Sequence, residues 1–383
     1  MKPTFLCLAA ACALLPVLAG CSDADIPDPT GPTDPPESAQ LAPPPQGQGF
    51  QWTTGQVEVE PGQEVQECHF YRVSELAAMG GLPVDKSFNL HRIQIGQRKG
   101  SHHMNIFRVN TVPTDTAAPF QTPFEDHREQ VGLNGKGACF VSPNWADWPL
   151  IANSQQDGQL DWTYPDGVAN ELKQDEWLML QTHYVNATTQ ETPEGFGEVF
   201  VNFWNVPDSE VEQRMGTVFA TKQSIRICRS QPTPSFSGSC QVKSDKPVTV
   251  IGANGHFHSR GKQFRMYTWD GKSTEPSSPD PFYISDAWDE PPMSHSPELV
   301  QPLTKDGGIY YSCDFQWHEP DPSVGCAGVD AIDRKKMEAE GKTEQEIVDA
   351  LDCCYRFGPI VEENEHCNVF AYYYPASDDV ICF

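Results

Sequence analysis

The sequence predicts an all-β fold of two tandem, jelly-roll-like β-sandwich domains, with a short helical insertion in the second domain. Beyond residue 49 the chain is dominated by short segments that alternate or are rich in β-branched residues, separated by Gly, Pro, Asn and Asp turns. The folded part, 50–383, has the length of two domains. Helical patterning is scarce and confined to one segment.

The segments with strand patterning are spaced like the strands of β-sandwiches. They are 55–61, 88–96, 104–110, 177–186, 197–206, 246–258, 262–269, 308–317 and 368–375. In 331–354, by contrast, charged residues surround Ile332, Ile347, Val348 and Leu351. This segment predicts one or two short helices inserted between strands.

The first residues carry an export signal. In 1–20 an apolar run follows Lys2, and the tetrapeptide Leu-Ala-Gly-Cys ends at Cys21. Cleavage before Cys21 would leave a cysteine that takes a diacylglycerol, so we expect an exported protein tethered by lipid. An ordinary secretory signal is the alternative. Ser22 resembles the residue after the lipidated cysteine in lipoproteins of the outer membrane, which predicts a place in the cell envelope.

A linker and two domains follow the signal. Residues 21–49 are rich in proline, aspartate and small polar residues and have too little apolar surface to fold. The joint at 205–207 contains a proline, and strand-like sequence ends there before a new set begins. We therefore expect domains at 50–206 and 207–383.

The chain is strongly acidic, with 26 basic and 53 acidic residues and a formal net charge of -27. A nucleic-acid partner is excluded because binding phosphate needs a basic surface. An anionic membrane face would repel the chain, so the lipid is the one membrane contact we expect. We expect a monomer.

Cysteine usage fits an oxidising compartment. Of thirteen cysteines, Cys7 and Cys12 leave with the signal and Cys21 is the expected anchor. Ten remain, and an even number in an exported protein predicts disulfides.

Six of the eleven histidines fall in patterns that can bind a metal: His102, His103, His183, His256, His258 and His366. The HxH pair would place both rings on one face of a strand. Imidazole suits copper, zinc, iron and nickel, whereas calcium or magnesium would need clustered carboxylates. Taken singly, each could instead be a strand histidine that only makes a hydrogen bond. If the six meet, they indicate a transition metal.

The order of these motifs resembles the copper type II, ascorbate-dependent monooxygenases, the family of peptidylglycine and dopamine hydroxylases. HHM is followed by QTHY, then HFH, then a ligand before CN in a tyrosine-rich last strand, and the resemblance starts near Gly55. It implies two β-sandwich domains, each holding one copper ion, with an open cleft between them. The first copper, which passes on electrons from a reductant such as ascorbate, would be bound by His102, His103 and His183. The second, where O2 is reduced and a substrate C–H bond is hydroxylated, would be bound by His256, His258 and His366.

The resemblance also implies disulfides. These join Cys68 with Cys139, Cys240 with Cys382, and Cys313 with Cys367. The family does not place Cys228, Cys326, Cys353 and Cys354. A bond from Cys326 to Cys353 or Cys354 would staple the helical segment.

Two residues are candidates for a catalytic role by the same resemblance, and three positions depart from the family. Gln181 matches a glutamine near the cleft, although it could be a polar residue on the wet face of a strand, and Asn368 also matches. Asn254 and Phe370 replace the arginine and tyrosine that hold a glycine carboxylate, which argues against a peptidylglycine substrate. His366 replaces a methionine, and imidazole in place of a soft thioether favours Cu(II) and lowers the reduction potential.

Three functions follow as hypotheses. The first is a copper-dependent monooxygenase with two copper ions, acting on an unknown small molecule or peptide with O2 and a reductant. The second is a copper-binding or copper-storage lipoprotein that lost hydroxylation when the methionine became His366. The third, a zinc hydrolase, needs a carboxylate base such as Glu363 or Glu365. Strand alternation would point Glu365 away from the face of His366.

Overall fold

In the computed structural model of this chain, the described residues are 41–62, 64–98, 101–109, 129–133, 148–155, 159–186, 197–288, 291–320, 331–350, 352–358, 364–377 and 379–383. All of them belong to one compact unit. The expected signal peptide, the anchor Cys21 and the linker up to residue 40 lie outside the described residues.

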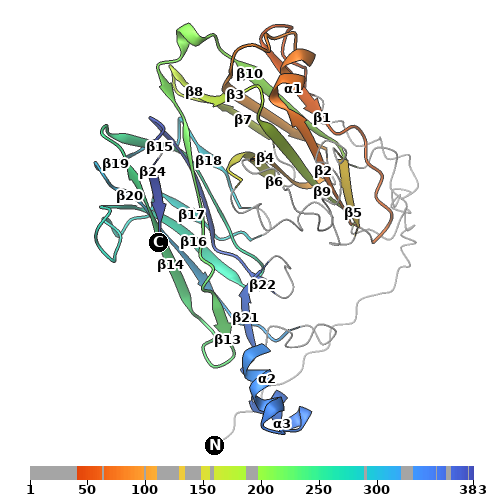
Figure 1. Cartoon of the computed structure of the whole chain (residues 1–383), viewed down its shortest axis with the longest axis vertical. Coiled ribbons are helices and arrows are strands. Elements are labelled where there is room, and N and C mark those ends of the chain that lie inside the picture. The colour runs from red at the N-terminus through yellow and green to blue at the C-terminus, as the bar shows by residue number, and fades with distance from the viewer. Residues whose placement is uncertain are drawn as a thin grey trace, which may run out of the picture. The chain divides into compact units, whose positions relative to one another are not determined.

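The strands before residue 206, together with one short strand at residues 213–214, form two sheets (Figure 1). Sheet 1, in the order β1-β10-β3-β8-β11 with β7 beside β3, is made of β1 (Gly49–Thr53), β3 (Phe88–Gln97), β7 (Gln159–Thr163), β8 (Val168–Leu172), β10 (Val199–Asn205) and β11 (Gln213–Arg214). Sheet 2, in the order β5-β2-β9-β4-β6, is made of β2 (Glu64–Arg72), β4 (Ser101–Val109), β5 (Glu129–Leu133), β6 (Leu150–Gln155) and β9 (Trp177–Val185). Alternate residues of both sheets, such as Ile93, Ile95, Leu178 and Leu180, are fully buried in one shared core, as a period of two requires.

The strands after residue 215 form three more sheets. Sheet 3, in the order β12-β23-β15-β18 with β19 beside β15, is made of β12 (Gly216–Thr221), β15 (Val248–His256), β18 (Ser294–His295), β19 (Gln301–Leu303) and β23 (Asn368–Tyr374). Sheet 4, in the order β17-β16-β20-β14-β24, is made of β14 (Ser235–Lys243), β16 (Gly261–Trp269), β17 (Tyr283–Ser285), β20 (Gly308–Phe315) and β24 (Asp379–Cys382). Sheet 5, in the order β13-β21-β22, is made of β13 (Arg226–Cys228), β21 (Cys354–Phe357) and β22 (Asn364–Glu365). Sheets 3 and 4 enclose a second core that includes Val250, Phe264 and Tyr311.

Helices are short: α1 (Val73–Met79), α2 (Ala331–Ala339), α3 (Glu344–Ala350) and the 3-10 turn η4 (Asp208–Glu210). The helices α2 and α3 lie in the segment 331–354, as the sequence predicts. Helix α1 was not predicted from the sequence. It begins where the Glu75 carboxylate accepts the backbone N–H of Arg72 at 2.9 Å, and it ends at Gly80. Its 7 residues make only about two turns, which is too short for the buried Val73 and Leu76 to show a helical period in the sequence.

The fold class is confirmed, since the structure is mostly β with several sheets and a small helical part. Eight of the nine predicted segments contain a named strand. The exception is 55–61, where Val57 makes only an isolated bridge to Gly197. The run ends at Pro61, which has no backbone N–H to extend a ladder.

The two sandwiches are packed against each other. On the side of sheet 2 that faces away from the first core, Trp148 and Met179 form a third apolar cluster with Phe370 of sheet 3. The Trp162 indole donates a hydrogen bond to Ser296 Oγ at 3.0 Å, and its ring lies 5.2 Å from that of Tyr372. Strands up to β10 pair within sheets 1 and 2, and strands from β12 onward pair within sheets 3 to 5. Because the two sandwiches also share buried contacts, the division into two domains stays a prediction.

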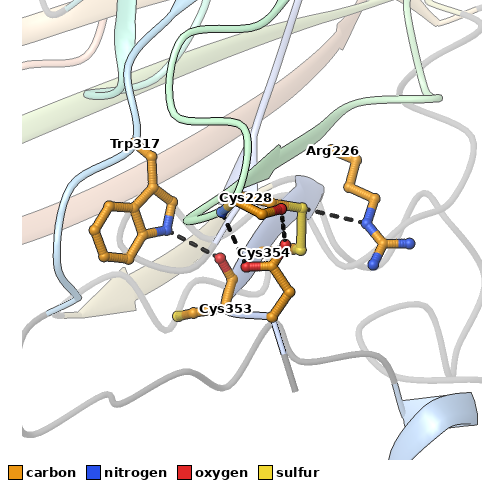
Figure 2. Close-up of a disulfide and its surroundings, with 7 residues drawn as sticks. Arg226, Cys228, Trp317, Cys353 and Cys354 are labelled. Atoms are coloured by element: carbon orange, nitrogen blue, oxygen red, sulfur yellow. Dashed lines mark hydrogen bonds between the residues drawn. A yellow bond between two sulfur atoms is a disulfide. The ribbon is translucent and has the colours of Figure 1, made fainter. Parts of the chain in front are cut away.

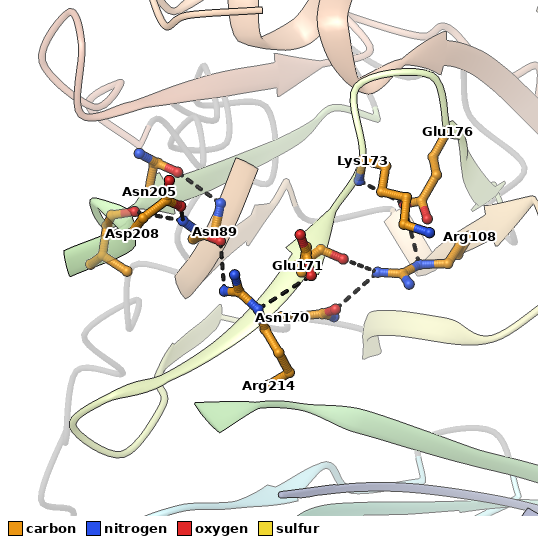
Figure 3. Close-up of polar contacts among 10 residues, drawn as sticks. Asn89, Arg108, Asn170, Glu171, Lys173, Glu176, Asn205, Asp208 and Arg214 are labelled. Atoms are coloured by element: carbon orange, nitrogen blue, oxygen red, sulfur yellow. Dashed lines mark hydrogen bonds and ion pairs between the residues drawn. The ribbon is translucent and has the colours of Figure 1, made fainter. Parts of the chain in front are cut away.

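The segment that connects the two sandwiches is fastened to sheet 1 by polar contacts (Figure 3). Asn89 of β3, 1% exposed, donates from Nδ2 to Asp208 at 2.7 Å and accepts from Arg214 at 2.8 Å. Arg214 also pairs with Glu171 at 3.2 Å, a half-exposed contact of little energetic weight. Because buried amides need their partners, Asn89 fixes where the chain leaves the first sandwich.

Candidate metal centre

Three of the predicted metal ligands come together at one end of sheet 3. His256 is the last residue of β15, His258 follows two residues later, and His366 precedes β23. Strands β15 and β23 are paired with His256 opposite Asn368, so the register brings the two chain segments to the same edge. Ring centroids are 4.2 Å apart for His258 and His366, and one nitrogen of each of the three rings lies within 4.8 Å of the others.

Burial keeps these three imidazoles uncharged. It lowers the pKa of His256 to about 3, with a smaller contribution from His258. It lowers the pKa of His258 to about 4 and holds that of His366 well below its usual value. Removing water from a cation is costly, and like charges nearby add to the cost. At neutral pH each ring therefore keeps a lone pair for a metal ion.

The orientation of His258 is fixed by a backbone group. Its Nδ1 lies 3.0 Å from the carbonyl oxygen of Asn364. A carbonyl can only accept, so Nδ1 carries the proton and the lone pair is on Nε2. This is how ligating histidines are commonly held, with one ring nitrogen donating and the other facing the metal.

Asn368, the predicted catalytic asparagine, lies beside this set. It is 1% exposed, and its amide nitrogen is 3.4 Å from Nδ1 of His366. Its position next to the ligands agrees with a role at this centre, although catalysis by Asn368 stays a prediction.

The first predicted set is partly brought together. His103 of β4 and His183 of β9 are paired across sheet 2, and their ring centroids are 5.0 Å apart. His102 precedes them in β4, but its side chain lies outside what the structure describes. The two described rings stand on the same side of sheet 2 as Phe107 and Met179, the side that packs on Phe370.

Gln181, the second predicted catalytic residue, is on that side of sheet 2, two residues before His183. It is 2% exposed, and its Oε1 accepts a hydrogen bond from Asn105 at 2.7 Å. The alternative that it sits on a wet strand face is wrong because the side chain is buried.

The donor set suits a transition metal such as copper, zinc, iron or nickel. Three uncharged imidazole nitrogens leave open positions around an ion. The Glu365 carboxylate is fully buried and is bound to backbone N–H groups, those of His258 and Arg260, at 2.9 Å each. Burial raises its pKa to about 7 against the lowering effect of these bonds. Glu365 is therefore engaged and not placed as a base beside a metal, which disfavours the zinc hydrolase; Glu363 lies outside the described residues.

A second group of side chains that could bind a metal contains a disulfide. Cys228, Asp352 and Cys354 lie together, but the two sulfurs are bonded to each other and are not available as thiolates (Figure 2). Arg226 donates to Cys228 Sγ at 3.3 Å, and Trp317 donates to the carbonyl of Cys353 at 3.0 Å.

Two of the expected disulfides are confirmed, Cys240 with Cys382 and Cys313 with Cys367. The bond between Cys228 and Cys354 was not predicted, and it excludes a bond from Cys326 to Cys354. Cys68 and Cys353 are disulfide-bonded. Cys139 and Cys326 lie outside the described residues.

Comparison of the sequence with protein-family models and with curated proteins found no match. Among the described residues, none of the helices has the length and apolar composition needed to cross a membrane.

Sequence reasoning missed the structural part that Glu365 plays in this centre. The two-residue strand that carries Glu365 leaves no periodic signal, so the sequence indicates only a possible hydrolytic base there. The signal that could have found it is its position directly before a candidate ligand in Asn-Glu-His-Cys.

Proposed function

We propose that this protein is a copper-dependent monooxygenase that hydroxylates a C–H bond of an unidentified small molecule or peptide with O2 and a reductant such as ascorbate. The observation that carries the proposal is the convergence of His256, His258 and His366 into one cluster of uncharged nitrogens, with His258 and His366 buried and His256 half-buried. The order of the motifs and their resemblance to the copper monooxygenases support it.

Two copper ions per chain are part of the proposal. His256, His258 and His366 would hold the ion at which oxygen chemistry takes place, and His102, His103 and His183 the ion that receives electrons. Copper supplies one-electron redox chemistry and affinity for dioxygen. The chain supplies neutral nitrogen donors, an incomplete ligand shell and an apolar surround at Phe357, whose ring is 5.1 Å from that of His366.

Neighbouring groups of the chain would position the ligand rings and take no part in electron transfer. The carbonyl of Asn364 holds the His258 ring, and Asn368 lies beside His366. The Asn254 side chain donates to the carbonyl oxygens of Pro291 and Pro292 at 3.1 Å. With its amide committed there, Asn254 offers no cationic group for a carboxylate, which favours a substrate other than a peptidylglycine.

A second function has one observation in its favour. All three donors of the cluster are imidazoles, and without a thioether they favour Cu(II). This would suit a copper-binding or copper-storage lipoprotein that no longer activates oxygen. In both cases we propose export to the cell envelope, a lipid anchor at Cys21 in the outer membrane, and a monomer.

Oxygen consumption separates the two functions. Wild type, His366→Met and the ligand-loss control His258→Ala are loaded with copper, freed of unbound copper and supplied with ascorbate. A monooxygenase consumes O2 faster in wild type than in His258→Ala. If only His366→Met consumes O2 faster than His258→Ala, the storage role is supported. If the three proteins consume O2 at the same rate, the monooxygenase proposal is overturned.

Copper content tests the proposal independently of turnover. Protein purified from the periplasm is expected to contain copper, up to two ions per chain, and its oxidation state can be read by electron paramagnetic resonance. Zinc without copper in that material would contradict both functions.

A further inference from the structure

Among the described residues, Glu365 is the most deeply buried acidic side chain. It is fully buried in β22, directly before His366. One carboxylate oxygen accepts the backbone N–H of His258 at 2.9 Å, and the other accepts that of Arg260 at 2.9 Å. The carboxylate therefore closes a bridge between the segment after β15 and the segment before β23.

The preceding residue completes the bridge. The carbonyl of Asn364 accepts from Nδ1 of His258 at 3.0 Å and from Nη1 of Arg260 at 3.4 Å. Arg260 Nη1 also lies 3.4 Å from the Glu365 carboxylate, and its guanidinium stacks over Tyr355, 3.5 Å from the ring centroid. Two consecutive residues of β22 thus bind both the backbone and the ring of one ligand.

This arrangement solves a geometric problem. His258 and Glu365 are 107 positions apart in sequence, and neither His258 nor His366 lies within a strand. Strand pairing fixes His256 opposite Asn368, but it does not fix two ligands beyond the ends of the ladder. A buried carboxylate is costly unless donors satisfy it, so its presence here indicates that these bonds are kept.

We propose that Glu365, supported by Arg260, is a positioning residue that holds His258 and His366 in register for the metal ion. The metal part of this inference rests on the proposed function. The geometric part does not, because the bridge is made entirely of residues of the chain.

The test uses the full chain with Glu365→Gln and Glu365→Ala. Asp314→Asn is the control for the loss of an acidic charge away from the cluster, since Asp314 forms a partly exposed ion pair with Arg265 at 2.7 Å in sheet 4. In metal-free protein, hydrogen exchange of the His258 and Arg260 amides is followed by NMR, together with the tautomer of His258. In protein titrated with Cu(II), affinity and the electron paramagnetic resonance spectrum are measured.

In metal-free Glu365→Ala we expect faster exchange at both amides and a mixed His258 tautomer, with smaller changes in Glu365→Gln. The affinity of the three-histidine site for Cu(II) should fall about 10- to 100-fold, as is typical when an outer partner of a ligand is lost. Asp314→Asn should change neither. Unchanged exchange and tautomer in a folded Glu365→Ala overturn the inference.

Failure of the proposed function gives a different result. If wild type binds no copper at this cluster while the exchange and tautomer still respond to Glu365, the copper function fails and the positioning role stands. If copper binds in wild type and is unaffected by both Glu365 variants, the positioning role fails and the copper function stands.

Discussion

The two histidine sets are built in different ways. His103 and His183 face each other as a cross-strand pair within sheet 2, so strand register alone brings them together. His258 and His366 lie beyond the ends of their strands and are held by backbone bonds to β22 and by the neighbouring disulfide of Cys367. A histidine pair inside a ladder therefore needs little support, whereas a set beyond the ladder depends on residues outside the proposed ligand set.

Removal of ligands should have the largest effect and tests whether the sets are separate. His258→Ala should lose one copper per chain and His183→Ala the other, since each leaves too few donors to hold an ion. The fall in copper affinity should exceed the roughly 100-fold that is the upper range when a residue supporting a ligand is replaced. Copper content after dialysis against a chelator of known affinity measures it.

The double variant should bind no copper at either set. A single variant that loses both ions would show that the two sets form one centre, and one that keeps both would show that its histidine is not a ligand.

Disulfide removal should separate stability from metal binding. Loss of Cys313–Cys367 or of Cys240–Cys382 should each lower the free energy of unfolding by about 2–5 kcal/mol, as disulfides mainly constrain the unfolded chain. Only the first loss should also weaken copper binding, because Cys367 is next to His366. Paired Cys→Ala variants compared by urea unfolding and Cu(II) titration give both quantities. Equal copper affinity in the two variants would show that β22 alone holds the cluster.

The sequence was informative where a period or a spacing carries the structure. Alternation predicted eight strands and thus the fold class, and the resemblance of the motifs to the copper monooxygenases predicted that His366 joins His256 and His258. The physical reason given for HxH was only partly right. His256 ends β15 and His258 lies outside it, so the rings meet through the turn rather than on one strand face.

What the sequence could not predict depends on contacts between distant residues. The bond between Cys228 and Cys354 follows from the pairing of β13 with β21, two short strands without a pattern of their own. The role of Glu365 likewise depends on backbone groups 107 positions away, and backbone groups leave no trace in residue identity. Buried Gln181 was open to either reading because one polar residue in a strand does not reveal what covers it.

The burial that distinguishes the second set predicts how stability depends on pH. Unfolded histidines take up protons near pH 6.5, whereas folded His256 and His258 do so only near pH 3 and 4. The unfolded state therefore binds more protons as pH falls through 6.5, and the metal-free protein should lose stability, by at most about 1.4 kcal/mol per pH unit for each histidine.

Glu365 works in the opposite direction. Its pKa is raised to about 7, so its contribution is fully present below its ordinary value of 4.5 and is lost as pH rises through 7. Between pH 4.5 and 6.5 the three histidines should outweigh it. Urea unfolding of chelator-treated protein across this range should show a steeper acid slope in wild type than in His366→Gln. Equal slopes would mean that the cluster is hydrated when empty.

The smallest effect concerns the first set and the hydrogen bond between Asn105 and Gln181. Asn105→Ala leaves the buried Gln181 oxygen without its donor and should cost about 1–3 kcal/mol of stability. Replacing both, as Asn105→Leu with Gln181→Met, should cost less than the sum, because no buried polar group is left unsatisfied. A double-mutant cycle from urea unfolding measures the difference. Ascorbate-driven O2 consumption is measured on the same variants. If this activity follows stability across the cycle, Gln181 acts through packing. If activity falls whenever Gln181 is replaced, even in the stable double variant, Gln181 has the predicted catalytic role.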